Sequence, residues 1–241
     1  MKKRRLDEIL LEQENIKDKK EAFIIVTEGR VLIDGQKAIS PAQFVGVDAR
    51  VEVKGDDAYV GRGALKLEAA LEKSGIDALG KICIDIGAAT GGFTEVLLRR
   101  GAAKVYAIDT ARGKLALKIR QDPRVVVMED TDIRDVERLP EEADIAVIDI
   151  SLISLRDILA SARRLLASDG AVAALFKPQY ETRDPTILHH GVIRDSRDRE
   201  KLLMDFTDWL GQNGWRVVGK IESPIRGGKG NVEYLLWLTI R

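Results

Sequence analysis

The segment Ile82-Cys83-Ile84-Asp85-Ile86-Gly87-Ala88-Ala89-Thr90-Gly91-Gly92-Phe93 indicates the class of fold. Its first five residues are mostly apolar and fit a buried strand. Small residues follow directly, and a helical pattern begins after them, so the segment predicts a strand, a tight loop and a helix. Gly91 and Gly92 can adopt backbone angles that other residues avoid, and a loop of small residues lets a ligand approach the backbone closely.

Apolar runs that are typical of strands continue to alternate with helical segments after this point. The runs are Lys104–Ile108, Val125–Met128, Ile145–Ile150 and Ala171–Phe176. The alternation predicts an open, mostly parallel sheet with helices on both faces, which is a doubly wound α/β fold. Ligands of such folds bind at the carboxyl ends of the strands.

The end of the second strand carries Asp109, an acid that can accept hydrogen bonds from ribose hydroxyls. The loop after the first strand lacks the G-x-G-x-x-G spacing, so a dinucleotide pyrophosphate is a poor fit. A ligand without phosphate fits this loop better. The alternative is that the glycines only form a tight turn.

Four charged residues are expected to meet at one rim of the sheet. Asp149 and Lys177 each end an apolar strand, and Glu233 precedes the last one, Tyr234–Ile240. If that last strand is antiparallel, its start lies beside the ends of the others. Lys66, on the helical segment Ala64–Glu68, would complete the group. The alternative is a set of salt bridges with no chemical role.

This group suits methyl transfer from a sulfonium to a ribose 2′-hydroxyl, because the hydroxyl must lose a weakly acidic proton. A lysine removes that proton only when it is neutral, and a nearby cation and partial burial both favour the neutral amine. We expect Lys177 to be the base and Lys66 to be the nearby cation. Asp149 would orient the ammonium group, and Glu233 would hold Lys66 or the ribose.

We expect the first 55 residues to form a separate module, followed by a linker at 56–61 and a larger domain at 62–241. Helical spacing covers Arg5–Leu11 and Lys20–Thr27, Asp34-Gly35 predicts a hairpin, and Ala49–Lys54 alternates as a strand. The order resembles the S4 RNA-binding domain, a helix pair on a small sheet. The resemblance implies RNA contacts through basic residues: Arg4, Arg5, Lys17, Lys19, Lys20 and Arg30. A module that only docks a protein is the alternative.

Composition narrows the function classes. The chain has 241 residues, 45% hydrophobic and 32% charged, with zero net charge, which excludes a disordered chain and counts against non-specific coating of nucleic acid. No apolar run approaches a membrane span and no signal peptide is visible, so we expect a cytoplasmic protein without a membrane partner. Cys83 is expected to be a buried thiol. His189 and His190 lack partners at ligand spacing, so no metal site is expected.

Six strings in order carry a resemblance over nearly the whole chain. They are Val60–Leu67, Asp85–Thr94, Ile148–Leu155, Lys177–Glu181, Gly191–Asp195 and Ser223–Tyr234. The sequence resembles the hemolysin A (TlyA) family of ribosomal RNA 2′-O-methyltransferases, with an FtsJ-like catalytic domain. The resemblance implies a Rossmann-like, class I methyltransferase domain with an antiparallel last strand, after an α+β S4-like domain. It also implies ribosomal RNA or ribosomal subunits as the substrate.

The family's Lys-Asp-Lys-Glu tetrad corresponds to Lys66, Asp149, Lys177 and Glu233. The resemblance implies that S-adenosylmethionine is held by the residues of two loops and two strand ends: Asp85, Gly87, Ala88, Gly91, Gly92, Phe93, Asp109 and Asp132, the last facing the adenine edge. Arg62, Arg226 and Lys229 are further candidates for RNA contact. A flexible hairpin connection is the alternative for the loop 226–230.

Three other functions remain as alternatives. A nicotinamide-dependent enzyme would use the same fold, but the missing G-x-G-x-x-G motif argues against it. A membrane-damaging cytolysin is suggested by the family's historical name, but no strongly amphipathic helix is visible. A non-catalytic RNA-binding or ribosome-assembly factor would not need the complete tetrad.

Overall fold

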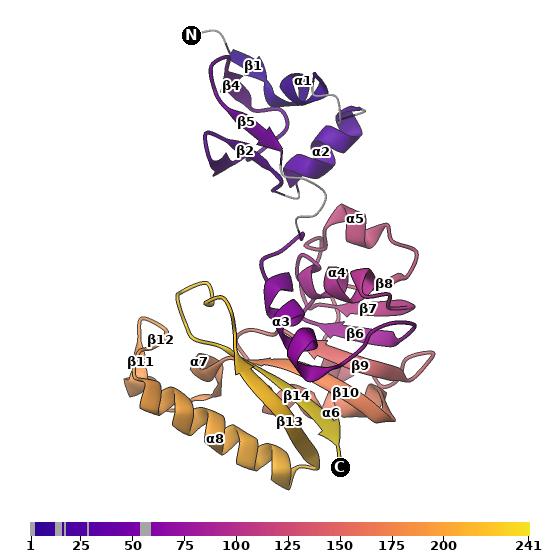
Figure 1. Cartoon of the computed structure of the whole chain (residues 1–241), viewed down its shortest axis with the longest axis vertical. Coiled ribbons are helices and arrows are strands. Elements are labelled where there is room, and N and C mark those ends of the chain that lie inside the picture. The colour runs from indigo at the N-terminus through magenta and orange to yellow at the C-terminus, as the bar shows by residue number, and fades with distance from the viewer. Residues whose placement is uncertain (1–2, 13–15, 17, 28, 54–58) are drawn as a thin grey trace. The chain divides into compact units, whose positions relative to one another are not determined.

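The computed structural model describes residues 3–12, 16, 18–27, 29–53 and 59–241 (Figure 1). The chain divides into two compact units, which we describe separately. The first comprises Met1–Val60 with Ala116–Gln121, and the second comprises Gly61–Leu115 with Asp122–Arg241. Of the expected linker, residues 56–58 lie outside the described part of the chain.

The first unit combines two helices with short strands. Its elements are β1 (Lys3–Arg5), α1 (Leu6–Leu11), α2 (Lys19–Thr27), β2 (Val31–Ile33), β3 (Gln36–Lys37), β4 (Phe44–Gly46) and β5 (Val51–Val53). α2 begins where the Asp18 carboxylate accepts a hydrogen bond from the Glu21 backbone N–H, 2.8 Å away. Leu6 and Leu10 of α1 pack with Ile25 and Val26 of α2 in the apolar core of the unit.

The hairpin expected at Asp34-Gly35 is present. Both residues have positive φ, 48° and 80°, between the paired Ile33 and Gln36, as a two-residue hairpin loop requires. β2 lies between β3 and β5 in a three-stranded sheet. The sequence did not predict β1 and β4, which pair antiparallel. Each has only three residues, too few for an alternating pattern to be visible.

A seven-stranded sheet forms the centre of the second unit. The order is β13 (Trp215–Glu222), β14 (Tyr234–Ile240), β10 (Leu166–Phe176), β9 (Ala143–Ile148), β6 (Ile82–Ile86), β7 (Lys104–Ile108) and β8 (Val125–Met128). The five strands β10, β9, β6, β7 and β8 are parallel, and β14 is antiparallel to β10 and β13. The expected doubly wound sheet with an antiparallel last strand is therefore confirmed.

Helices cover both faces of this sheet (Figure 1). α6 (Arg156–Leu165) and α8 (Ser196–Gln212) pack on the face to which β10 contributes Ala174 and Phe176. α3 (Ala64–Ser74) lies against the opposite face, where its Ala70 packs with Leu175, and α4 (Gly92–Arg99) lies beside α3. Neighbouring residues of β10 thus pack into the apolar cores on opposite faces of the sheet. This explains why residues 171–176 are a continuous run of apolar residues.

The chain order of the strands creates a crevice at the middle of the sheet. From β6 the chain continues outward through β7 and β8, and then returns to the other side of β6 as β9 and β10. The loops that follow β6 and β9 therefore diverge, as at the ligand-binding switch point of doubly wound folds. Among the described residues, no helix has the length and apolar character needed to cross a membrane.

Candidate active site

A cavity of about 670 Å³ opens at this switch point, entirely within the second unit. Its walls come from the loops after β6 and β9, the start of α3, and α7 (Pro178–Glu181). The hairpin of β11 (Leu188–His189) and β12 (Val192–Ile193) and the loop 225–233 complete them. The size falls within the range of small-molecule sites.

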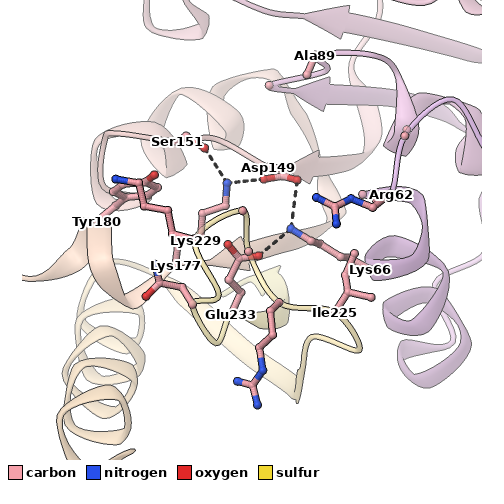
Figure 2. A pocket seen from close by; sticks show the side chains of 18 of the residues that line it. Arg62, Lys66, Ala89, Asp149, Ser151, Lys177, Tyr180, Ile225, Lys229 and Glu233 are labelled. Carbon is pink, nitrogen blue, oxygen red and sulfur yellow. Dashed lines mark hydrogen bonds and ion pairs between the residues drawn. The ribbon is translucent and has the colours of Figure 1, made fainter. Parts of the chain in front are cut away.

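An alternating row of charges lies on one wall of this cavity (Figure 2). Lys177 Nζ is 2.6 Å from Asp149 Oδ1. The other oxygen of the same carboxylate, Oδ2, is 3.9 Å from Lys66 Nζ. Lys66 Nζ donates to Glu233 Oε2 at 2.7 Å. The structure therefore brings together the four residues expected to meet at the rim, in the order Lys177, Asp149, Lys66 and Glu233.

Three of the four side chains are buried so deeply that their charges need partners. Lys66, Lys177 and Glu233 are 8%, 7% and 3% exposed. A buried charge is costly unless an opposite charge and hydrogen bonds compensate it. Two lysines and two carboxylates have zero net charge, and each lysine contacts a carboxylate directly. Loss of Lys66 would leave the buried Glu233 carboxylate without its partner, and loss of Asp149 would leave the buried Lys177 without its carboxylate.

The topology of the sheet explains the meeting of residues that are distant in sequence. Asp149 and Lys177 directly follow the parallel neighbours β9 and β10. Phe176 pairs with Tyr234 in the antiparallel ladder of β10 and β14, so Lys177 and Glu233 leave that ladder at the same end. Lys66 belongs to the first turn of α3, which packs across β10 and β14.

The loop after β6 is shaped by residues with positive φ. Gly87 and Gly91 have φ of 87° and 91°, and Ala89 has φ of 47°. Gly91 is the residue before α4, whose first residue is Gly92. The Ala89 backbone N–H donates to Asp109 Oδ2 at 2.8 Å, and the Ala111 N–H donates to Oδ1 at 2.7 Å. Asp109 thus holds the loops after β6 and β7 together.

Asp85, on β6, is fully buried beneath this loop. Its Oδ2 accepts a hydrogen bond from the Thr94 hydroxyl at 2.6 Å. Its Oδ1 has no hydrogen-bond partner among the described residues. Burial raises the pKa of Asp85 to about 7. The hydrogen bond from Thr94 lowers this pKa, and the negative charge of Asp149 raises it further.

The residues expected to hold the cofactor separate into two groups. Gly87, Ala88, Gly92 and Phe93 line the cavity, whereas Asp85, Gly91, Asp109 and Asp132 are not among its lining residues. Asp132 begins the turn η1 (Ile133–Asp135), where its carboxylate accepts from the Arg134 backbone N–H. The Arg134 guanidinium lies 2.6 Å from the same carboxylate. The roles of all eight in cofactor binding stay predictions.

The residues expected to contact RNA belong to both units. Arg62, Arg226 and Lys229 line the cavity. In the first unit, Lys19 and Lys20 are exposed and Arg30 is partly buried, and Lys17 lies outside the described residues. Arg4 forms an ion pair with Glu12, and Arg5 forms one with Asp7. Those carboxylates would compete with RNA phosphates for the two guanidinium groups.

The sequence did not predict several polar residues of the cavity wall, among them Ser151, Gln179 and Tyr180. Lys177 Nζ donates to Ser151 Oγ at 2.9 Å, and lies 6.0 Å from the centre of the Tyr180 ring. Ser151 follows Asp149 by two residues after β9. Alternation along an extended segment, which places such residues on one side, is the signal that would have found it.

A buried amide joins two walls of the cavity. Asn231 donates from Nδ2 to the Gly191 carbonyl at 2.9 Å and accepts from the Ile193 N–H at 3.2 Å. It thus fixes the loop 225–233 to the β11–β12 hairpin. The turn of this hairpin is His190-Gly191, both with positive φ. His189 and His190 are exposed there. Cys83 is buried, as expected.

Comparison with known proteins agrees with a catalytic unit of this kind. The model of the family described as FtsJ-like methyltransferase matches residues 59–240. This chain belongs to the FtsJ-like methyltransferase family. That membership argues against the nicotinamide-dependent alternative, since the family is one of methyl transfer.

Two relatives and one solved structure are similar over most of the chain. The 16S/23S rRNA (cytidine-2′-O)-methyltransferase TlyA of Mycobacterium tuberculosis is 40% identical, over 97% of this chain and 89% of that protein. Hemolysin A of Brachyspira hyodysenteriae is 37% identical, over 98% and 100%. A solved structure named "Putative hemolysin", from Streptococcus thermophilus, is 37% identical with a TM-score of 0.75, over 100% of this chain and 89% of that one.

Proposed function

We propose that this protein transfers a methyl group from S-adenosylmethionine to a ribose 2′-hydroxyl of ribosomal RNA, with Lys177 as the general base. One observation carries the proposal. The row of charges from Glu233 through Lys66 and Asp149 ends at Lys177, on the wall of a cavity that the glycine loop also lines. The similarity to a relative that is named as an rRNA 2′-O-methyltransferase supports the choice of substrate.

The glycine loop and its supports fit the proposed cofactor. Gly87, Ala88, Gly92 and Phe93 would contact it in the cavity, and the Asp109 carboxylate retains acceptor capacity for ribose hydroxyls. The buried Asp85, with one oxygen unpartnered among the described residues, would support the loop from below. When bound, S-adenosylmethionine supplies a methyl group on a positively charged sulfur, which the ribose oxygen takes up.

The protein's own contribution is to remove the hydroxyl proton. The neutral amine of Lys177 accepts that proton and becomes an ammonium ion, which Asp149 Oδ1 then stabilises at 2.6 Å. Lys66 supplies a second positive charge on the other side of Asp149, 3.9 Å from its Oδ2. Glu233 fixes Lys66 and satisfies its charge. General base action of this kind contributes roughly 10²–10⁴-fold.

RNA would reach the cavity through its basic rim. Arg62, Arg226 and Lys229 line the cavity and would bind phosphates near the target ribose. The S4-like first unit would contact folded RNA elsewhere, through Lys19, Lys20 and Arg30. Recognition should rest on shape and on splayed single-stranded bases, because the A-form major groove is too narrow to read. Ribosomal RNA as the substrate implies that the protein acts in the cytoplasm.

The experiment that tests the proposal follows a labelled methyl group from S-adenosylmethionine to ribosomal subunits and to free ribosomal RNA. The RNA is digested to nucleosides, and the label is assigned to base or ribose. Lys177→Ala is compared with Lys201→Ala, which removes an exposed lysine of α8. Cofactor binding is measured separately by calorimetry for all three proteins.

We expect label in the ribose with the native protein and with Lys201→Ala, and its loss with Lys177→Ala. Unchanged cofactor affinity in Lys177→Ala would assign that loss to the chemical step. Label in a base would contradict ribose methylation. Cofactor binding without transfer to any RNA would favour the ribosome-assembly alternative over an enzyme.

A further inference from the structure

The Lys177 ammonium is held by two acceptors from one short segment. Asp149 Oδ1 lies 2.6 Å from Nζ, and Ser151 Oγ lies 2.9 Å from it (Figure 2). Both residues follow β9, two positions apart, and both line the cavity. The remaining position on the tetrahedral nitrogen is the one left for a substrate.

The number of acceptors matters because a base works through its lone pair. A neutral amine has two N–H groups and one lone pair at three staggered positions around the Cε–Nζ bond. If Asp149 alone held one N–H, the lone pair would occupy either of the two other positions, and one of these faces Ser151. If Asp149 and Ser151 each hold an N–H, the lone pair must take the third position.

We propose that Ser151 is a positioning residue that aims the lone pair of Lys177 at the substrate hydroxyl. This inference rests on the proposed function, in which Lys177 is the general base. Ser151 touches neither the transferred methyl nor the departing proton. Its effect is on orientation: among neutral Lys177 amines, a larger fraction has the lone pair directed at the substrate hydroxyl.

A second set of contacts keeps the two segments in register. Glu181, in the α7 turn that follows Lys177, accepts from Ser154 Oγ at 2.6 Å and from the Leu155 N–H at 2.7 Å. It also pairs with Arg156 at 2.7 Å. Two sets of contacts therefore join the segment 149–156 to the segment 177–181. Asp149 contacts Lys177 at one end, and residues 154–156 contact Glu181 at the other. These contacts support the position of the Ser151 hydroxyl beside Nζ.

The test compares Ser151→Ala and Ser151→Thr with Ser154→Ala as the matched control. Ser154→Ala removes a hydroxyl three residues along the same segment, one that contacts Glu181 and not Lys177. The Leu155 N–H and the Arg156 guanidinium still hold Glu181 in that variant. Each variant is assayed for single-turnover methyl transfer to ribosomal RNA between pH 6 and 9.5, with RNA and S-adenosylmethionine affinities measured in parallel.

We expect Ser151→Ala to lower the single-turnover rate roughly 3- to 30-fold with unchanged affinities, the size of effect that loss of orientation by one hydrogen bond produces. Ser151→Thr, which keeps the hydroxyl, should restore most of the rate. Ser154→Ala should lower the rate less than Ser151→Ala does, because it leaves both acceptors of the Lys177 amino group in place.

Two results with an active native enzyme would overturn the inference while leaving the proposed function intact. One is a native single-turnover rate in Ser151→Ala. The other is a loss of rate in Ser151→Ala that is explained by weaker RNA affinity, or that Ser154→Ala reproduces in full. A native protein that methylates no RNA would instead remove the proposed function, and the role of Ser151 with it.

Discussion

Gly87 lies so close to Asp149 that a Cβ atom at residue 87 would come within 2.5 Å of the Asp149 carbonyl oxygen. The contact joins the glycine loop after β6 to the segment that carries the proposed catalytic carboxylate. It explains why a glycine is needed there in addition to the positive φ of 87°. The loop that would hold the cofactor and the residue that would orient the base are therefore packed as one piece.

Substitution of Gly87 by alanine should disturb both functions together. We expect Gly87→Ala to lower the free energy of unfolding by roughly 1–3 kcal/mol and to weaken cofactor binding at least tenfold, since the new methyl group meets backbone. Thermal unfolding and calorimetry measure the two effects. Gly113→Ala is the control, because Gly113 also has positive φ, 72°, but open space around its Cβ position. Equal effects of the two changes would contradict the close-contact explanation.

The pair of Lys66 and Glu233 should show strong energetic coupling. Glu233→Gln keeps the shape of the side chain but leaves Lys66 buried with only the more distant Asp149 as a charged partner. A double-mutant cycle with Lys66→Met and Glu233→Gln should give a coupling energy of about 1–3 kcal/mol in chemical denaturation. Each single variant should be less stable than the double variant. A single change leaves one buried charge without its partner, whereas the double change removes both charges. Additive effects would show that the pair is not coupled.

Asp85 should make the fold less stable as pH rises. Its folded pKa of about 7 lies above the ordinary value of 3.8, chiefly because of burial. Between these values the folded protein retains a proton that the unfolded chain has released, so this group lowers stability progressively from about pH 4 to 7. Asp85→Asn should therefore gain stability over the native protein across that window, on the order of 2–4 kcal/mol by pH 8.

The comparison in that experiment is Asp195→Asn. A hydrogen bond from Arg197 lowers the pKa of Asp195 to about 2, so the native carboxylate adds stability that is lost as pH falls through that value. Asp195→Asn should thus lose stability relative to the native protein as pH rises from 2 to 4. Urea unfolding at a series of pH values measures whether each variant gains or loses stability relative to the native protein as pH rises. A difference between Asp85→Asn and the native protein that does not change with pH would contradict the buried, proton-binding carboxyl.

The basic loop beside Glu233 should contribute to RNA affinity through phosphates. We expect the pair of changes Arg226→Ala and Lys229→Ala to weaken RNA binding and to reduce the slope of log affinity against log salt by about 1–2. The transfer rate at saturating RNA should change little. Arg216→Ala with Lys220→Ala removes two cations from the exposed side of β13 and serves as the control. Unchanged RNA affinity in the loop variant would contradict a role in RNA binding and would favour the alternative that the loop is only a hairpin connection.

The local pattern of the sequence was sufficient for most of the catalytic unit. The strands β6, β7 and β8 have the expected bounds, and β9 and β10 cover most of their expected runs. Except for β8 at the edge of the sheet, these strands are mostly buried on both faces, so their apolar runs stand out from the helices between them. β13 was not expected, because the exposed apolar Val218 and the adjacent Gly219 interrupt the alternation of apolar and polar residue types along this edge strand. The β11–β12 hairpin has too few residues in each strand to form a pattern.

The sequence by itself determined which residues end each strand, because apolar runs and the small residues after them are local features. It thereby indicated Asp149, Lys177 and Glu233 as neighbours at one edge. Only the tertiary structure decided the contacts: that Lys66 pairs with Glu233, 167 residues away, and that Lys177 is shared between Asp149 and Ser151. Such contacts depend on the register of strands and the packing of α3 on the sheet, which arise from long-range burial that no local pattern encodes.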